Sequence, residues 1–133
     1  MTLLTQQMHV KPLASKGTRI CIMQNSCVFN RHLRRFEEDY HRPMYDAMLK
    51  LLAPSKELKE AYKKGVIDWK AYVPRFKREV LEPQAELIQL IGILALSQDI
   101  TLLCSEPTPD YCHRRLIAEE CKKYHPNLAL VIR

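Results

Sequence analysis

The sequence predicts an α/β protein in which helices pack on the faces of a small parallel sheet of about three strands. Residues 100–104 (ITLLC) form a short run without polar alternation, which is typical of strands covered on both faces. Residues 84–97 just before them carry apolar residues at helical spacing, and further strand-like segments lie at 18–24 and 128–132. Strands alternating with helices make parallel crossovers. We therefore expect a Rossmann-like or flavodoxin-like layering with the strand at 100–104 in the middle.

The first part of the chain contains one predicted strand between two less regular segments. Residues 1–17 are predicted to be a loosely ordered basic lead-in, and residues 18–133 a single α/β domain with one core. The β-branched and apolar content of residues 18–24 predicts the first strand. Residues 25–42 show no clean periodicity. Pro43 suits a first helical position and predicts a helix through Leu52.

Helix signals follow one another from residue 55 onward. Ser55 can cap a helix that runs to Lys64, and Gly65 can close it in the left-handed conformation. Asp68 can cap the next helix, in which Pro74 predicts a kink. An aromatic and apolar stripe at helical spacing along this helix predicts core packing; its members are Trp69, Tyr72, Val73, Phe76 and Val80.

Positive charge is concentrated near the start of the chain. The 133 residues include 21 basic and 15 acidic side chains, for a formal net charge of +6. Residues 1–36 contain no acid, and their basic residues account for the whole excess; they are Lys11, Lys16, Arg19, Arg31, Arg34 and Arg35. Such a segment attracts phosphates, so nucleic acid is a candidate partner. Phe29 and Phe36 are the aromatic residues that this segment offers for base stacking.

The composition predicts a cytoplasmic protein that does not associate with membranes. The sequence has no apolar stretch of about 18 residues, and residues 1–17 lack the apolar centre of a signal peptide. Five cysteines without framework spacing fit a reducing compartment.

Reactive side chains concentrate in residues 104–115, between the predicted buried strand and the following helix. A Pro-rich turn leads from Cys104 to a helix predicted from about Tyr111 to Tyr124, with Asp110 as its N-cap. A thiolate at the end of such a strand faces the helix start, where unpaired N–H groups favour an anion. The candidate site residues are Cys104, Glu106, Cys112, His113 and Arg114.

Two of these segments carry a family resemblance. Residues 101–106 (TLLCSE) and 112–118 (CHRRLIA) resemble the signature of the uncharacterised family called domain of unknown function 488, in its form with a Cys-Glu pair followed by Cys-His-Arg. Residues 51–58 (LLAPSKEL) and 64–69 (KGVIDW) resemble its YeaO-like branch, and the whole likeness spans residues 18–120. The family has no agreed activity, so the resemblance implies a shared site without naming a reaction.

The resemblance also directs attention to the loop after the first strand. Family members usually carry an Arg and a Trp-Pro-Arg-Gly-like segment there, where this chain reads MQNSCVF at residues 23–29. Arg31, Arg34 and Arg35 lie a little further on and can replace those arginines only if the loop folds back, and the ligand-binding candidates among them are Arg31 and Arg35. Together with Gln24 they are candidate ligand-binding residues, alongside Arg114 and Cys112.

The leading functional hypothesis is a small-ligand or anion-binding cleft that belongs to a thiol-dependent enzyme. Cys104 would be the nucleophile or redox thiol, and Glu106 or His113 the acid or base. The cysteine-phosphatase pattern does not fit, because Asp110 stands six residues after Cys104, where that chemistry needs Arg. The sequence leaves the cofactor unknown.

Three alternatives stay open at this point. One is a nucleic-acid-binding module that uses the basic first third of the chain. Another is a metal site of Cys104, Cys112 and His113, with Glu106 as a fourth ligand; these types suit zinc or iron, but adjacent Cys112 and His113 are expected to point in different directions. In the third, the cysteines are small core residues, and Glu106 pairs with Arg114 or Arg115.

Overall fold

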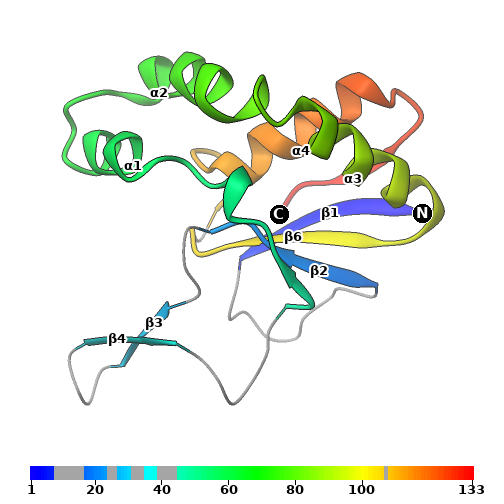
Figure 1. The fold of residues 1–133 in the computed structure, drawn as a ribbon, viewed down its shortest axis with the longest axis horizontal. Helices are drawn as coiled ribbons and strands as arrows, with labels where there is room; N and C mark the ends of the chain where they lie inside the picture. Colours follow the sequence, from blue (N-terminus) through cyan, green and yellow to red (C-terminus); the bar gives the residue numbers. More distant parts are fainter. Residues whose placement is uncertain (8–16, 24–26, 31–34, 39–44, 107) are drawn as a thin grey trace.

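The main sheet has five parallel strands in the order β5-β2-β6-β1-β7 (Figure 1). The computed structural model describes residues 1–7, 17–23, 45–106 and 108–133, and the backbone alone of 27–30 and 35–38. The strands of the sheet are β1 (Thr2–Gln7), β2 (Thr18–Cys21), β5 (Ala47–Met48), β6 (Ile100–Cys104) and β7 (Ala129–Val131). A separate antiparallel pair joins β3 (Cys27–Asn30) to β4 (Arg35–Glu38).

The predicted α/β class, the parallel sheet and the central strand are confirmed. All five residues of β6 are buried, which explains the absence of polar alternation in its sequence. The sheet has five strands instead of about three. The two additional strands are β1 and β5.

The expectation of a loosely ordered lead-in is wrong for residues 2–7. Strand β1 lies between β6 and β7, with Leu3 paired to Ile100 on one side and to Leu130 on the other. Leu3 and Thr5 are fully buried. Residues 8–16 lie outside the part of the chain that the structure describes. The polar residues of the segment TLLTQQ do not give the apolar pattern that predicts a strand. Its backbone amides nevertheless form hydrogen bonds with the two neighbouring strands, β6 and β7.

Helices cover the sheet on the side shown above it in Figure 1. They are η1 (Lys50–Leu52), α1 (Lys56–Lys63), α2 (Trp69–Phe76), the π-helical turn η2 (Lys77–Leu81), α3 (Ala85–Ser97) and α4 (His113–Tyr124). Helices α3 and α4 pack against each other, and both contact β1 and β6. The core between helices and sheet includes Leu102, Phe76 and Ile117, each 0% exposed.

Several predicted helix ends are confirmed. The Ser55 side chain accepts a hydrogen bond from the Leu58 amide at 3.1 Å, and Asp68 accepts one from the Ala71 amide at 2.9 Å. Gly65 has φ +73°, the left-handed conformation predicted for the end of α1. The aromatic stripe of α2 is core packing as predicted, since Tyr72, Phe76 and Val80 are buried there.

The helix predicted from Pro43 to Leu52 is wrong in its described part. Ala47 and Met48 instead pair with Ile20 and Cys21 as the edge strand β5, and only residues 50–52 form a helical turn. Tertiary pairing with β2 outweighs the local helical pattern here. Pro43 itself lies outside the described residues.

Among the described residues, no single helix is long and apolar enough to cross a membrane. The pair Trp69–Leu81 and Ala85–Ser97, bent by 87°, passes that test when its two arms are taken together, by length and composition alone.

Candidate functional site

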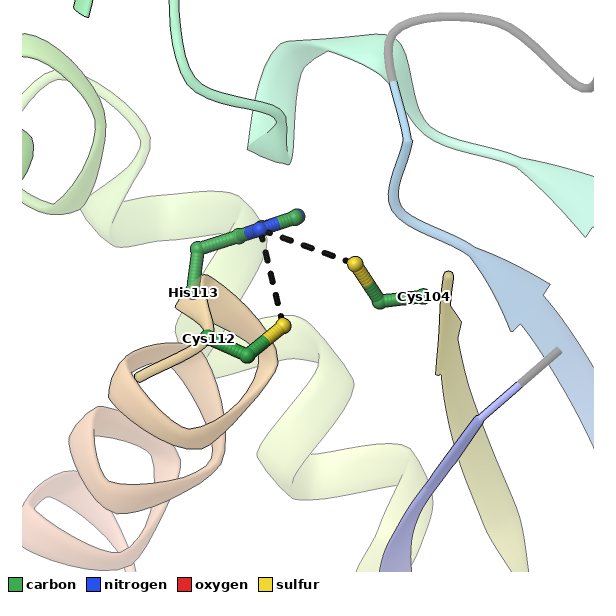
Figure 2. Close-up of side chains that lie close together, drawn as sticks. All are labelled: Cys104, Cys112 and His113. Atoms are coloured by element: carbon green, nitrogen blue, oxygen red, sulfur yellow. Dashed lines mark hydrogen bonds between the residues drawn. The ribbon is translucent and has the colours of Figure 1, made fainter. Parts of the chain in front are cut away.

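The carboxyl end of β6 and the start of α4 bring two cysteines and a histidine together (Figure 2). The Nδ1 atom of His113 lies 3.8 Å from the Sγ atom of Cys104 and 3.9 Å from that of Cys112. All three side chains are buried, with exposed fractions of 3% for Cys104, 2% for Cys112 and 7% for His113. The imidazole nitrogen therefore faces both sulfur atoms within one small space.

The expectation that Cys112 and His113 point in different directions is wrong. Helix α4 begins at His113, and Cys112 is its N-cap residue with an extended backbone (φ −132°, ψ 142°). Because Cys112 is not helical, its side chain can turn toward the sheet beside that of His113. The predicted start at Tyr111 with Asp110 as cap is also wrong, since Asp110 instead pairs with Arg115 at 3.5 Å.

The backbone of Ile22, the residue after β2, fixes the tautomer of His113. Its Nε2 atom lies 2.7 Å from the carbonyl oxygen of Ile22. A carbonyl oxygen can only accept, so Nε2 carries a proton and donates it. Proton exchange at this imidazole therefore takes place at Nδ1, the atom that faces Cys104 and Cys112.

The pKa values of Cys104 and Cys112 are shifted in opposite directions. A hydrogen bond from Cys112 lowers the pKa of Cys104 well below its usual range; the nearby His113 and the backbone N–H of Glu106 also lower it, while burial opposes them. The pKa of Cys112 is raised, because its proton is held by Cys104 and because it is buried. One negative charge in this pair therefore resides on Cys104.

The other described cysteines are unlike Cys104. Burial raises the pKa of Cys121 to about 12, and its thiol donates to the carbonyl oxygen of Ile88 at 3.4 Å. Burial also raises the pKa of Cys21. These thiols stay protonated near neutral pH and provide internal comparisons for any reactivity of Cys104.

Arg114, a predicted ligand-binding residue, is buried and its guanidinium is occupied by contacts within the protein. It is 0% exposed, and its guanidinium donates to the carbonyl oxygens of Glu106 at 2.7 Å and Arg133 at 3.0 and 3.1 Å. It also donates to Cys112 Sγ at 3.5 Å. Arg114 is thus a positioning residue that ties the turn after β6 to the end of β7.

Glu106 and the neighbouring charges form no ion pair of the predicted kind. Arg114 contacts the backbone oxygen of Glu106, and Arg115 pairs with Asp110 and with Glu119, the latter at 2.8 Å. The Glu106 side chain is exposed and borders the pocket over the two cysteines.

A pocket of about 210 Å³ opens over the cysteine pair. Cys104, Cys112 and His113 line it together with Glu106, and α1 and α2 contribute part of its other walls. Further lining residues are Met23, Pro54, Lys59, Tyr62, Lys63, Tyr72, Ser105 and Tyr111. The residues from α1 and α2 were missed by sequence reasoning; the one available signal was the placing of Lys59 and Lys63 four residues apart, on the same face of a helix.

The remaining candidate site residues belong to the segment after β2. Gln24 and Arg31 lie outside the described residues, and so does the side chain of Arg35, whose backbone forms part of β4. Met23, the last described residue after β2, does line the pocket.

The fold and these side chains define a class: a parallel α/β protein with a cysteine–histidine site between the end of a central strand and the next helix. Residues 5–125 match the family model described as the active DUF488-N3 subclade, in its N3a form. The chain belongs to the DUF488 family, as the Cys-Glu and Cys-His-Arg segments predict. Comparisons with curated proteins and with solved structures give no match.

Proposed function

We propose that this protein is a thiol-dependent enzyme that uses Cys104 as a nucleophile on a small ligand bound in the 210 Å³ pocket. The observation that carries the proposal is the position of Nδ1 of His113, 3.8 Å from Cys104 Sγ, with Nε2 committed to the Ile22 carbonyl. This is the arrangement of a nucleophile, a base and a group that orients the base. The match to a subclade described as active supports the proposal.

The charge distribution fits such a nucleophile. Transfer of the Cys104 proton to Nδ1 produces a thiolate beside an imidazolium, and the Cys112 thiol stabilises that thiolate by a hydrogen bond. His113 can later return the proton to a leaving group.

Tyr72 adds a neutral donor to the same pocket. Burial raises its pKa, and the nearby sulfur atoms of Cys112 and Cys104 raise it further. The hydroxyl therefore keeps its proton near neutral pH and can donate to negative charge that develops on the ligand.

The test is alkylation by iodoacetamide, mapped residue by residue with mass spectrometry from pH 4 to 10. Because the pKa of Cys104 is lowered, its thiolate persists at pH values where a free thiol of pKa about 8.5 is protonated. We expect Cys104 to react at pH 6 at nearly its full rate, while Cys21 and Cys121 stay inert. A Cys104 rate that rises only near pH 8.5 contradicts the proposal.

A metal site is the second candidate, favoured by a specific observation. The ligand atoms of Cys104, Cys112 and His113 all lie within 4.8 Å of one another. Tetrahedral zinc with sulfur and nitrogen ligands places such atoms about 3.6 Å apart, close to the 3.8 and 3.9 Å found here. Donation from the opposite ring nitrogen to a carbonyl is also typical of metal-ligating histidine.

Metal content separates the two candidates. A zinc enzyme or structural zinc site predicts about one equivalent of metal per purified chain and faster Cys104 alkylation after chelation, because bound thiolates are shielded. The thiolate enzyme predicts substoichiometric metal and no effect of the chelator.

Two further expectations remain predictions. The nucleic-acid alternative rests mainly on Lys11, Lys16 and Arg31, which lie outside the described residues, and on Arg19, which pairs with Asp46 at 3.4 Å. A gel shift with unspecific DNA or RNA that weakens steeply with salt would support it. Membership of the YeaO-like branch is likewise proposed on the resemblance alone.

A further inference from the structure

We infer that the ligand of this pocket is a small organic anion whose charged group is held by Lys59 and Lys63 of α1, with its reactive centre directed at Cys104. The inference rests on the proposed function and names the substrate class of that site. It comes from the pocket walls that α1 contributes, which the cysteine signature does not include.

The two lysines occupy one face of α1. Residues 59 and 63 are one helical turn apart, so both side chains reach the same side, and both line the pocket that contains Cys104 and His113. Both are exposed, and among the described residues no ion pair joins either of them to a carboxylate. Within the described part of the chain, no carboxylate therefore competes with a ligand for these two charges.

The charges around the pocket leave an excess of positive charge. Among the lining residues that the structure describes, Glu106 is the one carboxylate, and it is opposed by the two lysines. Transfer of a proton from Cys104 to the adjacent His113 leaves the net charge of that pair unchanged. A monoanion would therefore neutralise the lining, whereas a cation would add to its excess.

The pocket also limits the size and shape of the anion. Its volume of about 210 Å³ lies below the roughly 300 Å³ at which pockets for drug-sized ligands begin. Tyr62 and Tyr111 stand in the same lining, and the Tyr111 ring, 61% exposed, contacts Trp69 edge-on with centroids 5.7 Å apart. A small carboxylate or phosphate ester with an apolar or planar part fits these walls.

The test compares two alkylating reagents of nearly equal size, anionic iodoacetate and neutral iodoacetamide. For Cys104 we expect the ratio of the iodoacetate rate to the iodoacetamide rate to exceed that of 2-mercaptoethanol by about fivefold, because two cations attract the anionic reagent. Added salt should reduce the ratio. Lys59→Gln combined with Lys63→Gln should return it to the value for 2-mercaptoethanol. Lys56→Gln, on the same helix but outside the lining, is the matched control and should leave it unchanged.

Each outcome has a definite meaning. If iodoacetamide modifies Cys104 at low pH but the ratio equals that of 2-mercaptoethanol, the anion inference is overturned and the proposed enzyme stands. If Lys56→Gln lowers the ratio as much as the double variant, the effect is the general charge of the helix, and the inference is also overturned. If neither reagent modifies Cys104 at any pH, the proposed function fails, and the inference falls with it.

Discussion

At the scale of single residues, His113 decides whether Cys104 is a reactive thiolate or an ordinary buried thiol. Its two nitrogens have separate tasks, since Nε2 donates to Ile22 and Nδ1 faces the sulfur atoms. Burial alone would raise the pKa of a thiol, as it does for Cys21. The lowered pKa of Cys104 therefore depends on specific donors and on the charge beside it.

His113→Gln separates these contributions. The amide of Gln keeps a donor toward Ile22 but removes the group at Nδ1, so the pKa of Cys104 should rise. Since the alkylation rate falls as the pH drops through the pKa, that fall should begin at a higher pH, with about a tenfold loss of rate for each pH unit below the new midpoint. Iodoacetamide rates from pH 4 to 10 measure it. An unchanged midpoint would show that Cys112 and the backbone N–H of Glu106 stabilise the thiolate without His113; Cys112→Ser, which retains a donor, is the companion variant.

Arg114 acts through the backbone rather than through a ligand. Arg114→Met leaves the carbonyl oxygens of Glu106 and Arg133 without their donor and should lower the free energy of unfolding by about 3 kcal/mol. Arg114→Lys should recover part of this loss. Arg115→Met removes only partly exposed ion pairs and should cost under about 1 kcal/mol. Urea denaturation measures all three; equal losses for Arg114→Met and Arg115→Met would contradict the role assigned to Arg114.

At the scale of elements, the packing of α3 against the end of α4 depends on Gly92, which has no side chain. A Cβ at Gly92 of α3 would overlap Cδ2 of the His125 ring and stand 2.9 Å from its Nε2. His125 also contacts the carbonyl oxygen of Gln89 through Nε2 at 3.1 Å. The ring thus lies directly against the helix backbone, where only glycine leaves room for it.

Gly92→Ala should lower the free energy of unfolding by about 2 kcal/mol, because the His125 ring must move. In a His125→Ala background the overlap is absent. There the same substitution should be neutral or stabilising by up to about 1 kcal/mol, since alanine favours a helix more than glycine. Thermal unfolding of the four proteins of this cycle measures the coupling, and an equal loss in both backgrounds would refute the packing argument.

At the scale of the whole molecule, β1 connects the central strand β6 to the C-terminal strand β7. It separates β6 from β7, and the Thr5 hydroxyl contacts the carbonyl oxygen of Arg133 at 3.2 Å. Arg133 in turn accepts from Arg114, next to the cysteine–histidine site. Loss of β1 would therefore disturb both the sheet and the support of the site.

Leu3→Ala should destabilise the protein by about 3 kcal/mol, because Leu3 is 0% exposed within the core. Leu90→Ala, at an α3 position that is 50% exposed, should cost under about 1 kcal/mol. Denaturant unfolding measures both. Hydrogen exchange adds an independent check, because the β1 amides should exchange as slowly as those of β6. Fast exchange in β1 would instead support the prediction that the first residues are loosely ordered.

Much of the chain from residue 55 onward could be predicted because its signals are local. Ser55, Asp68 and Gly65 act within one helical turn, and the buried run at 100–104 identifies the central strand by itself. Strands β1 and β5 were missed because a neighbouring strand, not their own pattern, makes them strands.

The sequence by itself determined the α/β class, the central strand and the group Cys104, Cys112 and His113, because those residues are close along the chain. Tertiary structure alone decided the roles within that group. It committed Nε2 of His113 to a carbonyl 91 residues away and buried Arg114 against the backbone of Arg133. It also brought Lys59 and Lys63 to the pocket. No local sequence pattern encodes these contacts, because each depends on how the helices pack against the folded sheet.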